Sequence, residues 1–543
     1  MQSGQRGDTA PRAEAEARAV DGLPTSADTE EPAADRVIPE PETTSVTRWR
    51  VAVGLAIAVG VVVRFTARSH LWLDETLSVN IGRLPLGDLF EALRHDGAPP
   101  FYYLVLHGWM DLVGSGTIAV RSLSGIFAVA ALPLMWVAGR RIGGTRMGLA
   151  AVLLLAASPF AVRYATEARM YSLVVLLALV AWLTLDDLLR RFSWWRAGVL
   201  ALTTGVLLLT QYWSFYLLAV TVATLGRRAR RGPGKGEALR ALAAVGAGCA
   251  LFLPWLPSFV YQVRNTGTPW GAAPTLRSVF DTVFQFAGGF WDPGFVLGLM
   301  FCGLIVLALF GHPMDGHRIE LDLRTRRAAW PLIVAGFGTL LLAVAAGMVT
   351  RSAFAVRYAS ILFPFVLLLV ALGTSALAHP KVFRTVAAVG VVLGFTATFP
   401  NVIGERTNAA RVARTLRAQG RPGDIVTYCP DQLGPPVTRL LPADNGLIHL
   451  TFPSAGSPEL VDWVGYAERN KASQTGPFSQ MLLERAGPEH TIWVVWAPGY
   501  RTLGTKCELL VDRLTKVRPD MERVVKLSKK AFEKPGLVRF RPR

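Results

Sequence analysis

The feature that most constrains this chain is a series of apolar blocks between residues 50 and 400. Each block is about 17 to 25 residues long, the length that an α-helix needs to cross a hydrocarbon core roughly 30 Å thick. Of the 543 residues, 51% are hydrophobic, a share that several soluble domains could also reach if the apolar residues were spread evenly. Their concentration in blocks instead predicts a polytopic α-helical membrane protein.

The basic residues orient these blocks. The formal net charge is +18, and Arg and Lys cluster in short loops such as 140–141, 190–191 and 227–235 rather than along one face. This placement indicates cytoplasmic loops and argues against a nucleic-acid partner. We expect a multi-pass plasma membrane protein with a cytoplasmic N-terminus and about eleven spans, near residues 50–67, 122–139, 147–163, 172–189, 196–210, 214–226, 239–257, 291–310, 328–348, 359–378 and 382–399.

Two regions flank this membrane domain, which we place at residues 48–400 with a first outer loop at 68–121. Residues 1–47 lack apolar periodicity and carry an acidic excess, which predicts a disordered cytoplasmic tail. No apolar segment lies near Met1, so we expect the first span to direct membrane insertion. Within the first outer loop, residues 100–113 are too short and too polar for a span, and we expect an interfacial helix there.

The region 401–543 is predicted to be an extracytoplasmic α/β domain. Short apolar runs at 424–428 and 491–496 are typical of buried strands, and amphipathic helices are expected near 404–419 and 507–517. In an extracytoplasmic domain Cys429 and Cys507 could form a disulfide, and the sequence leaves both states open.

An acidic pair, Asp74 and Glu75, follows the first span directly. Carboxylates are costly near hydrocarbon, so such a pair belongs at the water interface or in a functional site. The predicted topology brings polar residues from four outer corners to the same side of the membrane, namely Asp74, Glu75, His95, Asp96, Glu167, Arg169, Tyr171, Gln211, Tyr212, Arg357 and Tyr358. Arg169 and Arg357 break the positive-inside rule, which favours a role as phosphate ligands.

Four motifs stand at these corners: Trp72-Leu73-Asp74-Glu75, then His95-Asp96-Gly97-Ala98-Pro99-Pro100-Phe101-Tyr102-Tyr103, then Glu167-Ala168-Arg169-Met170-Tyr171, and Arg357-Tyr358 before an apolar span. Together they resemble the GT-C membrane glycosyltransferases, in the branch of protein O-mannosyltransferase-like enzymes, the lipid A aminoarabinose transferase and Rhizobium-type lipopolysaccharide glycosyltransferases. The resemblance covers about residues 50–400. Many relatives have His directly before the two prolines, so the role of His95 stays open.

The resemblance implies an inverting transfer of a sugar from a polyprenyl-phosphate donor to a hydroxyl of a cell-envelope glycan, lipid or protein outside the membrane. Asp74 would take the acceptor proton, while cations hold the leaving phosphate. No Gly-rich nucleotide loop occurs, in agreement with a lipid-linked donor. Mannose and arabinofuranose are both candidate sugars by analogy. We expect no cofactor and no metal, because the acidic residues and His95 lack compact ligand spacing.

The roles of several candidate site residues have two interpretations each. Glu75 either tunes Asp74, which we favour, or is a solvated neighbour. Glu167 either lines the site or forms a structural ion pair with Arg163 or Arg169. The remaining candidates are Tyr358 as a donor-phosphate ligand with Arg357 and Arg169, and the substrate-lining residues His95, Asp96, Tyr102, Tyr103, Tyr171, Gln211 and Tyr212. The tyrosines also fit an interfacial aromatic belt.

Two further classes of protein are rivals of an enzyme. A lipid-linked sugar flippase would carry charges near mid-membrane on broken helices and would often contain inverted repeats. Here the charges lie at span ends and no repeat is evident. A non-catalytic envelope scaffold would depend on residues 401–543 and not on Asp74.

Overall fold

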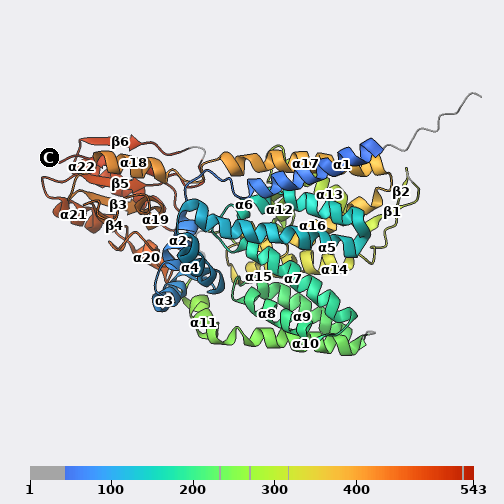
Figure 1. The fold of residues 1–543 in the computed structure, drawn as a ribbon. Coiled ribbons are helices and arrows are strands. Elements are labelled where there is room, and N and C mark those ends of the chain that lie inside the picture. The colour runs from blue at the N-terminus through green and yellow to red at the C-terminus, as the bar shows by residue number, and fades with distance from the viewer. Residues whose placement is uncertain (1–42, 232–233, 268–270, 316, 529–530, 543) are drawn as a thin grey trace, which may run out of the picture. The chain divides into compact units, whose positions relative to one another are not determined.

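The structure is a computed structural model that describes residues 43–231, 234–267, 271–315, 317–528 and 531–542. Most of the predicted tail at 1–47 therefore lies outside the described residues. Residues 43–47 begin the first helix, α1 (Thr43–Val63). Helices form the chain up to residue 403, apart from one short hairpin, β1 (Gly311–Pro313) with β2 (Ile319–Leu321), and five further strands belong to the C-terminal domain (Figure 1).

Each predicted span overlaps a helix. The helices that overlap the predicted spans are α1, α5 (Thr117–Ala157), α7 (Tyr171–Arg190), α8 (Trp194–Leu208), α9 (Ser214–Arg231), α10 (Lys235–Ala250), α13 (Gly294–Phe310), α15 (Thr339–Thr350), α16 (Phe363–Gly373) and α17 (Pro380–Ile403). Among the described residues, five helical segments are long and apolar enough to cross a membrane, and three more apolar helices are shorter. The polytopic helical class is confirmed, whereas the count of eleven spans stays a prediction.

The long helix α5 contains two predicted spans, joined by a turn at Gly143 and Gly144. Both residues have non-helical dihedral angles, and Gly144 has φ +78°, a left-handed conformation that glycine adopts without strain. A Cβ built on Gly139 would lie 2.9 Å from the Cα atom of Gly148. The two halves therefore fold back and pack closely against each other, as two separate spans would.

The predicted first outer loop folds into α2 (Leu73–Gly82), α3 (Leu86–Asp96) and α4 (Phe101–Val113). Helix α4 coincides with the predicted interfacial helix. Helix α3 ends at Gly97, whose φ of 81° closes the helix in the left-handed conformation. Asp74 and Glu75 occupy the first turn of α2, where the helix dipole favours negative charge.

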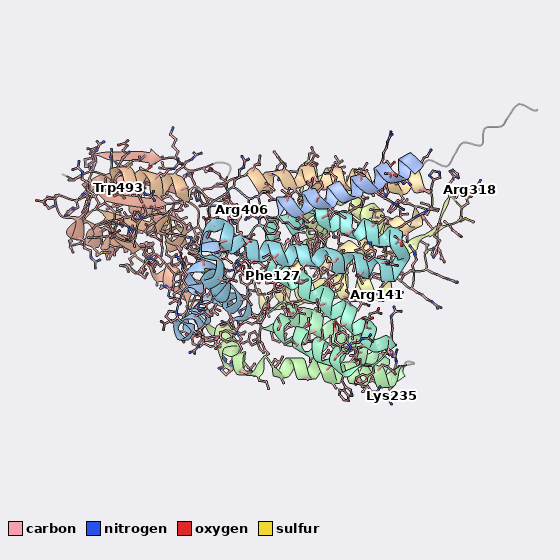
Figure 2. All side chains as sticks on the ribbon, viewed as in Figure 1. Phe127, Arg141, Lys235, Arg318, Arg406 and Trp493 are labelled. Atoms are coloured by element: carbon pink, nitrogen blue, oxygen red, sulfur yellow. A yellow bond between two sulfur atoms is a disulfide. The ribbon has the colours of Figure 1, made fainter. Side chains whose placement is uncertain are left out.

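Shorter helices connect the spans. They are α6 (Pro159–Ala165), α11 (Leu256–Asn265), α12 (Arg277–Phe286), α14 (Trp330–Ile333), and the 3-10 segments η1 (Leu253–Trp255), η3 (Val356–Ile361) and η4 (Thr374–Ala376), with a π-helical segment η2 (Val334–Gly338). Arg141, Lys235 and Arg318 lie at one end of the helices, whereas Arg406 lies at the other end (Figure 2). The basic loops that contain Arg141, Lys235 and Arg318 thus share one end of the helices, as the charge pattern predicts.

The C-terminal domain is built on a mixed sheet in the order β4-β3-β5-β7-β6. Strands β3 (Ile425–Cys429), β4 (Ile448–Thr451) and β5 (Ile492–Trp496) are parallel, and β7 (Gly536–Phe540) pairs antiparallel with β5 and with β6 (Met521–Val525). The helices are α18 (Ala409–Gln419), α19 (Gly434–Thr438), α20 (Tyr466–Ala472), α21 (Thr475–Ala486) and α22 (Lys506–Val517).

Both faces of this sheet are covered. Along β3, Ile425 and Cys429 pack with residues of α21 and α22, while Val426 and Tyr428 pack with residues of α18 and α19. This alternation follows from the two-residue repeat of a strand. Cys429 and Cys507 are disulfide-bonded, with Cα atoms 5.5 Å apart, which resolves the alternative that the sequence left open. The predicted α/β class of this domain is confirmed.

Candidate functional site

The candidate site centres on an ion pair between Asp74 and Arg357. Asp74 stands in the first turn of α2, and Arg357 stands on η3, directly before α16. The Arg357 Nη1 atom lies 3.4 Å from Asp74 Oδ2, and the two side chains keep 18% and 16% of their surface exposed. Burial alone would lower the pKa of Arg357, but Asp74 and neighbouring tyrosines raise it well above its ordinary value. A solvent-accessible carboxylate thus faces a permanently charged guanidinium group.

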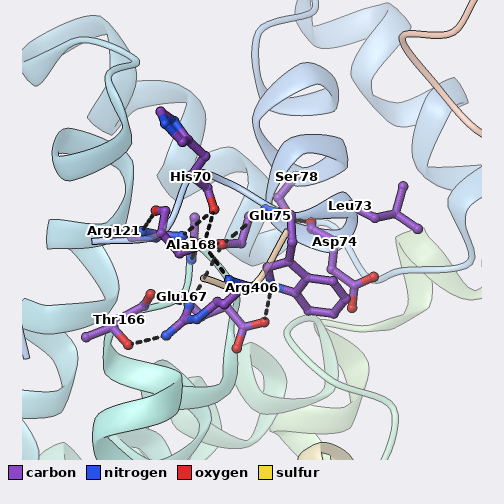
Figure 3. Close-up of polar contacts among 12 residues, drawn as sticks. His70, Leu73, Asp74, Glu75, Ser78, Arg121, Thr166, Glu167, Ala168 and Arg406 are labelled. Atoms are coloured by element: carbon purple, nitrogen blue, oxygen red, sulfur yellow. Dashed lines mark hydrogen bonds and ion pairs between the residues drawn. The ribbon is translucent and has the colours of Figure 1, made fainter. Parts of the chain in front are cut away.

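Glu75, the next residue, points away from solvent into a buried cluster (Figure 3). Arg121 donates to both of its carboxylate oxygens, at 2.7 and 2.6 Å, and the Ala168 amide donates at 3.0 Å. Arg406 lies 3.9 Å away. Burial alone would raise the pKa of Glu75, but Arg121 and Arg406 outweigh it and hold the pKa below the ordinary range. A solvated position for Glu75 does not fit this geometry, which favours a charged, structural carboxylate.

Arg169 approaches Asp74 from the segment between α6 and α7. Its Nη1 atom donates to Ser78 Oγ at 3.0 Å and to the Tyr103 hydroxyl at 3.1 Å, and lies 3.4 Å from the Asp74 carbonyl oxygen. The Tyr103 hydroxyl in turn donates to Asp96 Oδ2 at 3.1 Å. Burial raises the pKa of Asp96, and Arg169 partly offsets this effect. Three of the predicted motifs therefore meet in one hydrogen-bonded chain.

Aromatic rings border the Arg357 guanidinium. Its Cζ atom lies 5.9 Å from the Trp72 ring centroid and 5.5 Å from that of Tyr358. The Trp72 indole N–H donates to Glu167 Oε1 at 2.7 Å, and Glu167 also lies 3.6 Å from Arg163. These contacts favour the structural interpretation of Glu167, which holds the ring beside Arg357.

Tyr171 stacks edge-on against Tyr164, with ring centroids 4.7 Å apart. Its buried hydroxyl has no hydrogen-bond partner among the described residues, and the Tyr171 side chain lines a partly open pocket together with Arg64, Tyr164 and Ser172. Tyr171 begins α7, two residues after Arg169.

Four other candidates form hydrogen bonds with residues outside this group. Gln211 donates to the Tyr358 carbonyl oxygen at 3.1 Å, and so supports the segment that carries Arg357. The Tyr212 hydroxyl bonds Gln262 on α11 and accepts from Trp255. Tyr102 bonds Ser124 at 3.2 Å. His95 is partly exposed and bonds Asp462 of the C-terminal domain at 2.9 Å. None of these four has a direct bond to Asp74, Arg169 or Arg357 among the described contacts.

A metal site has little support in the part of the chain that the structure describes. No group of three or more His, Cys, Asp or Glu side chains there is arranged to hold a metal ion. The carboxylates at the site are instead matched by guanidinium groups. Independence of metal stays a prediction.

Several residues of the site were not anticipated from the sequence. Arg121 and Arg406 satisfy Glu75, Ser78 binds Arg169, and Glu533 contacts the start of α2. Arg121 carries a signal that could have revealed it, because it stands at the predicted outer end of a span, like Arg169 and Arg357. Ser78 and Glu533 carry no such signal in the sequence.

The fold and these contacts define a polytopic helical membrane protein with a carboxylate and two arginines beside the first turn of α2. Residues 97–257 match the family model described as "Dolichyl-phosphate-mannose-protein mannosyltransferase". No curated protein matches the chain by sequence.

Solved structures share the fold over nearly the full length. ArnT from Cupriavidus metallidurans in the apo state is 14% identical with a TM-score of 0.59, and the alignment covers 91% of this chain and 98% of ArnT. ArnT bound to undecaprenyl phosphate aligns with 13% identity, a TM-score of 0.58 and the same coverage. The resemblance to GT-C glycosyltransferases that the motifs indicated is confirmed at the level of the fold.

Proposed function

We propose that this protein is an inverting glycosyltransferase that moves a sugar from a polyprenyl-phosphate donor to a hydroxyl group on the outer side of the membrane. The observation that carries the proposal is the convergence of Asp74 with Arg357 and Arg169 at the start of α2. The acceptor would be a glycan, lipid or protein of the cell envelope. The ArnT structure that contains undecaprenyl phosphate supports the lipid-phosphate class of donor.

In the proposed reaction Asp74 is the base. As the acceptor oxygen forms a bond to the anomeric carbon, its proton passes to the Asp74 carboxylate, and the bond from that carbon to the phosphate oxygen breaks. The leaving polyprenyl phosphate keeps the electron pair of the broken bond. Arg357 and Arg169 would stabilise the charge that develops on it.

The Asp74–Arg357 pair suggests how the two side chains are arranged before a donor binds. Without a donor, each side chain neutralises the other across 3.4 Å. A phosphate that binds Arg357 would compete for the guanidinium group and leave Asp74 available to accept a proton. Tyr358 would act with Arg357 by fixing its direction, and Tyr103 and Asp96 would fix Arg169. The segments that carry Asp74, Arg169 and Arg357 would be supported by residues that do not bond to these three side chains, namely Gln211, Tyr212, Tyr102 and His95.

The proposed orientation places the C-terminal domain outside and the basic loops in the cytoplasm. The shared end of Arg141, Lys235 and Arg318 agrees with the positive-inside rule. The disulfide between Cys429 and Cys507 agrees with an oxidising compartment. The candidate sugars remain a mannose-like hexose and arabinofuranose.

The test uses the purified full-length protein with a panel of polyprenyl-phosphate sugars and mass spectrometry of donor and product. We expect one donor to be consumed, and we expect Asp74→Asn to lower turnover by at least about 10²-fold while the protein still inserts and folds. Asp88→Asn, an exposed change in the same outer loop, is the matched control and should retain turnover. Near-normal turnover of Asp74→Asn would refute the mechanism, and consumption of no donor by the unmodified protein would refute the proposed donor class.

A further inference from the structure

A segment of the C-terminal domain, residues 531–535, reaches the start of α2. The Leu73 backbone N–H donates to Glu533 Oε1 at 2.7 Å. The Phe532 ring meets the Trp72 ring edge-on, with centroids 5.2 Å apart. Trp72 and Leu73 directly precede Asp74, so both contacts fall at the residues that set its position.

The Leu73 amide needs such a partner. It belongs to the first turn of α2, whose N–H groups have no acceptor within the helix. The residue before the helix, Trp72, cannot supply one, because an indole only donates hydrogen bonds. Leu73 is only 7% exposed, so water has little access to this end of the helix. Glu533 therefore supplies an acceptor that the local sequence lacks.

Glu533 is itself fixed by the chain that enters the C-terminal domain. Its backbone N–H donates to the Arg406 carbonyl oxygen at 2.9 Å, and its own carbonyl accepts from the Asn408 amide at 3.3 Å. The Arg406 side chain reaches Glu75 and donates to Thr166. The same segment thus holds α2 on both sides of Asp74, through Leu73 and through Glu75.

We infer that Glu533 is a positioning residue that fixes the first turn of α2 and thereby aims Asp74, an inference that rests on the proposed function. The requirement is for a hydrogen-bond acceptor rather than for a charge. Burial, together with the nearby Asp74 and Glu75, raises the pKa of the Glu533 carboxyl to about 8 even though hydrogen bonds from Thr407 and Leu73 lower it, so the group is mainly a neutral acid at neutral pH. A glutamine, which keeps a carbonyl oxygen at the same distance along the side chain, should replace it.

The experiment compares full-length Glu533→Ala, Glu533→Gln and Glu533→Asp with the unmodified protein. Glu489→Ala, an exposed change in the same domain, is the control. Amide hydrogen exchange followed by mass spectrometry reads the peptides over residues 71–83. We expect Glu533→Ala to exchange about tenfold faster or more in these peptides, because Leu73 loses its acceptor. Glu533→Gln and Glu489→Ala should match the unmodified protein.

Turnover provides the second readout. With the donor that the unmodified protein consumes, Glu533→Ala should lower kcat by about 10- to 100-fold with little change in KM, because the base is misplaced rather than the donor lost. Glu533→Gln should restore most of the turnover. Glu533→Asp, one methylene shorter, should exchange faster than the unmodified protein over 71–83, and it serves as the decisive variant if Glu533→Ala does not fold.

Two results would overturn the inference: exchange over 71–83 that is unchanged in both Glu533→Ala and Glu533→Asp, or a Glu533→Gln variant as impaired as Glu533→Ala. The first readout does not depend on catalysis. If the unmodified protein consumed no polyprenyl-phosphate sugar while exchange changed as expected, the proposed function would fail and the support of α2 by Glu533 would stand.

Discussion

Replacing one partner of the Glu75–Arg121 pair should destabilise the protein far more than replacing both. The Arg121 side chain is 6% exposed and the Glu75 side chain 0%. Arg121→Met removes two hydrogen bonds to the carboxylate and two to the carbonyl oxygens of Ser69 and His70. Breaking a buried ion pair in this way costs roughly 3–5 kcal/mol, out of a total stability of about 5–15 kcal/mol.

The magnitude depends on what remains around Glu75. In Arg121→Met the carboxylate keeps the Ala168 amide and the more distant Arg406, which places the loss near the lower end of that range. Glu75→Leu leaves Arg121 buried without its carboxylate and should be similarly harmful. The double variant buries neither charge, so we expect it to lose less stability than either single variant, which requires a coupling energy above about 3 kcal/mol.

The assay is a denaturant titration in mixed micelles for the unmodified protein, both single variants and the double variant. The same samples are assayed for turnover. Strictly additive losses would contradict the assignment of Glu75 and Arg121 as one structural unit. A stable double variant without any turnover, whose peptides over α2 exchange normally, would show instead that Glu75 takes part in the chemistry.

Three other predictions follow from the geometry. Gly373→Ala would place a Cβ 2.0 Å from the Leu304 carbonyl oxygen and should cost about 1–3 kcal/mol, whereas Gly303→Ala, with nothing within 4 Å, should be neutral or slightly stabilising in the same denaturation assay. Replacing Cys429 and Cys507 by Ala opens a loop with a sequence separation of 78 residues and should lower the unfolding free energy by roughly 4.5 kcal/mol in the chain-entropy model; equal stability of the reduced and oxidised protein would contradict this. The pKa of Glu533, which lies beside Asp74, Glu75 and Arg406, is raised to about 8. Folding therefore favours the protonated form of Glu533. The contribution of this residue to the unfolding free energy should diminish as pH rises from about 4.3 to 8. The slope of unfolding free energy against pH should be less negative in Glu533→Gln, and identical slopes would refute the raised pKa.

The membrane architecture could be predicted because it depends on local properties. Apolar blocks of sufficient length become helices, and the turn at Gly143 and Gly144 that separates two spans needs only glycine in a basic loop. The strands at 425–429 and 492–496 were predictable for the same reason, since apolar runs bounded by Pro and Gly mark buried strands. The order of the strands required long-range pairing that no local pattern encodes.

The candidate site was predictable only where residues depart from the positive-inside rule. Arg169 and Arg357 were identified because they stand at predicted outward ends of spans, and both lie beside Asp74. The different surroundings of Asp74 and Glu75 were not predictable. They arise because Arg121 and Arg406 reach the Glu75 carboxylate and not that of Asp74. His95 shows the same limit, since its partner Asp462 belongs to another domain.

The contact between Leu73 and Glu533 joins residues 460 positions apart, and this separation has a consequence for biosynthesis. The first span and α2 emerge from the ribosome long before residue 533 is translated. Until then the turn that carries Asp74 lacks its acceptor at Leu73 and also lacks Arg406 beside Glu75. A nascent chain paused in the membrane therefore holds an unfinished site, and completion of the site is timed by translation of the C-terminal domain rather than by insertion of the spans.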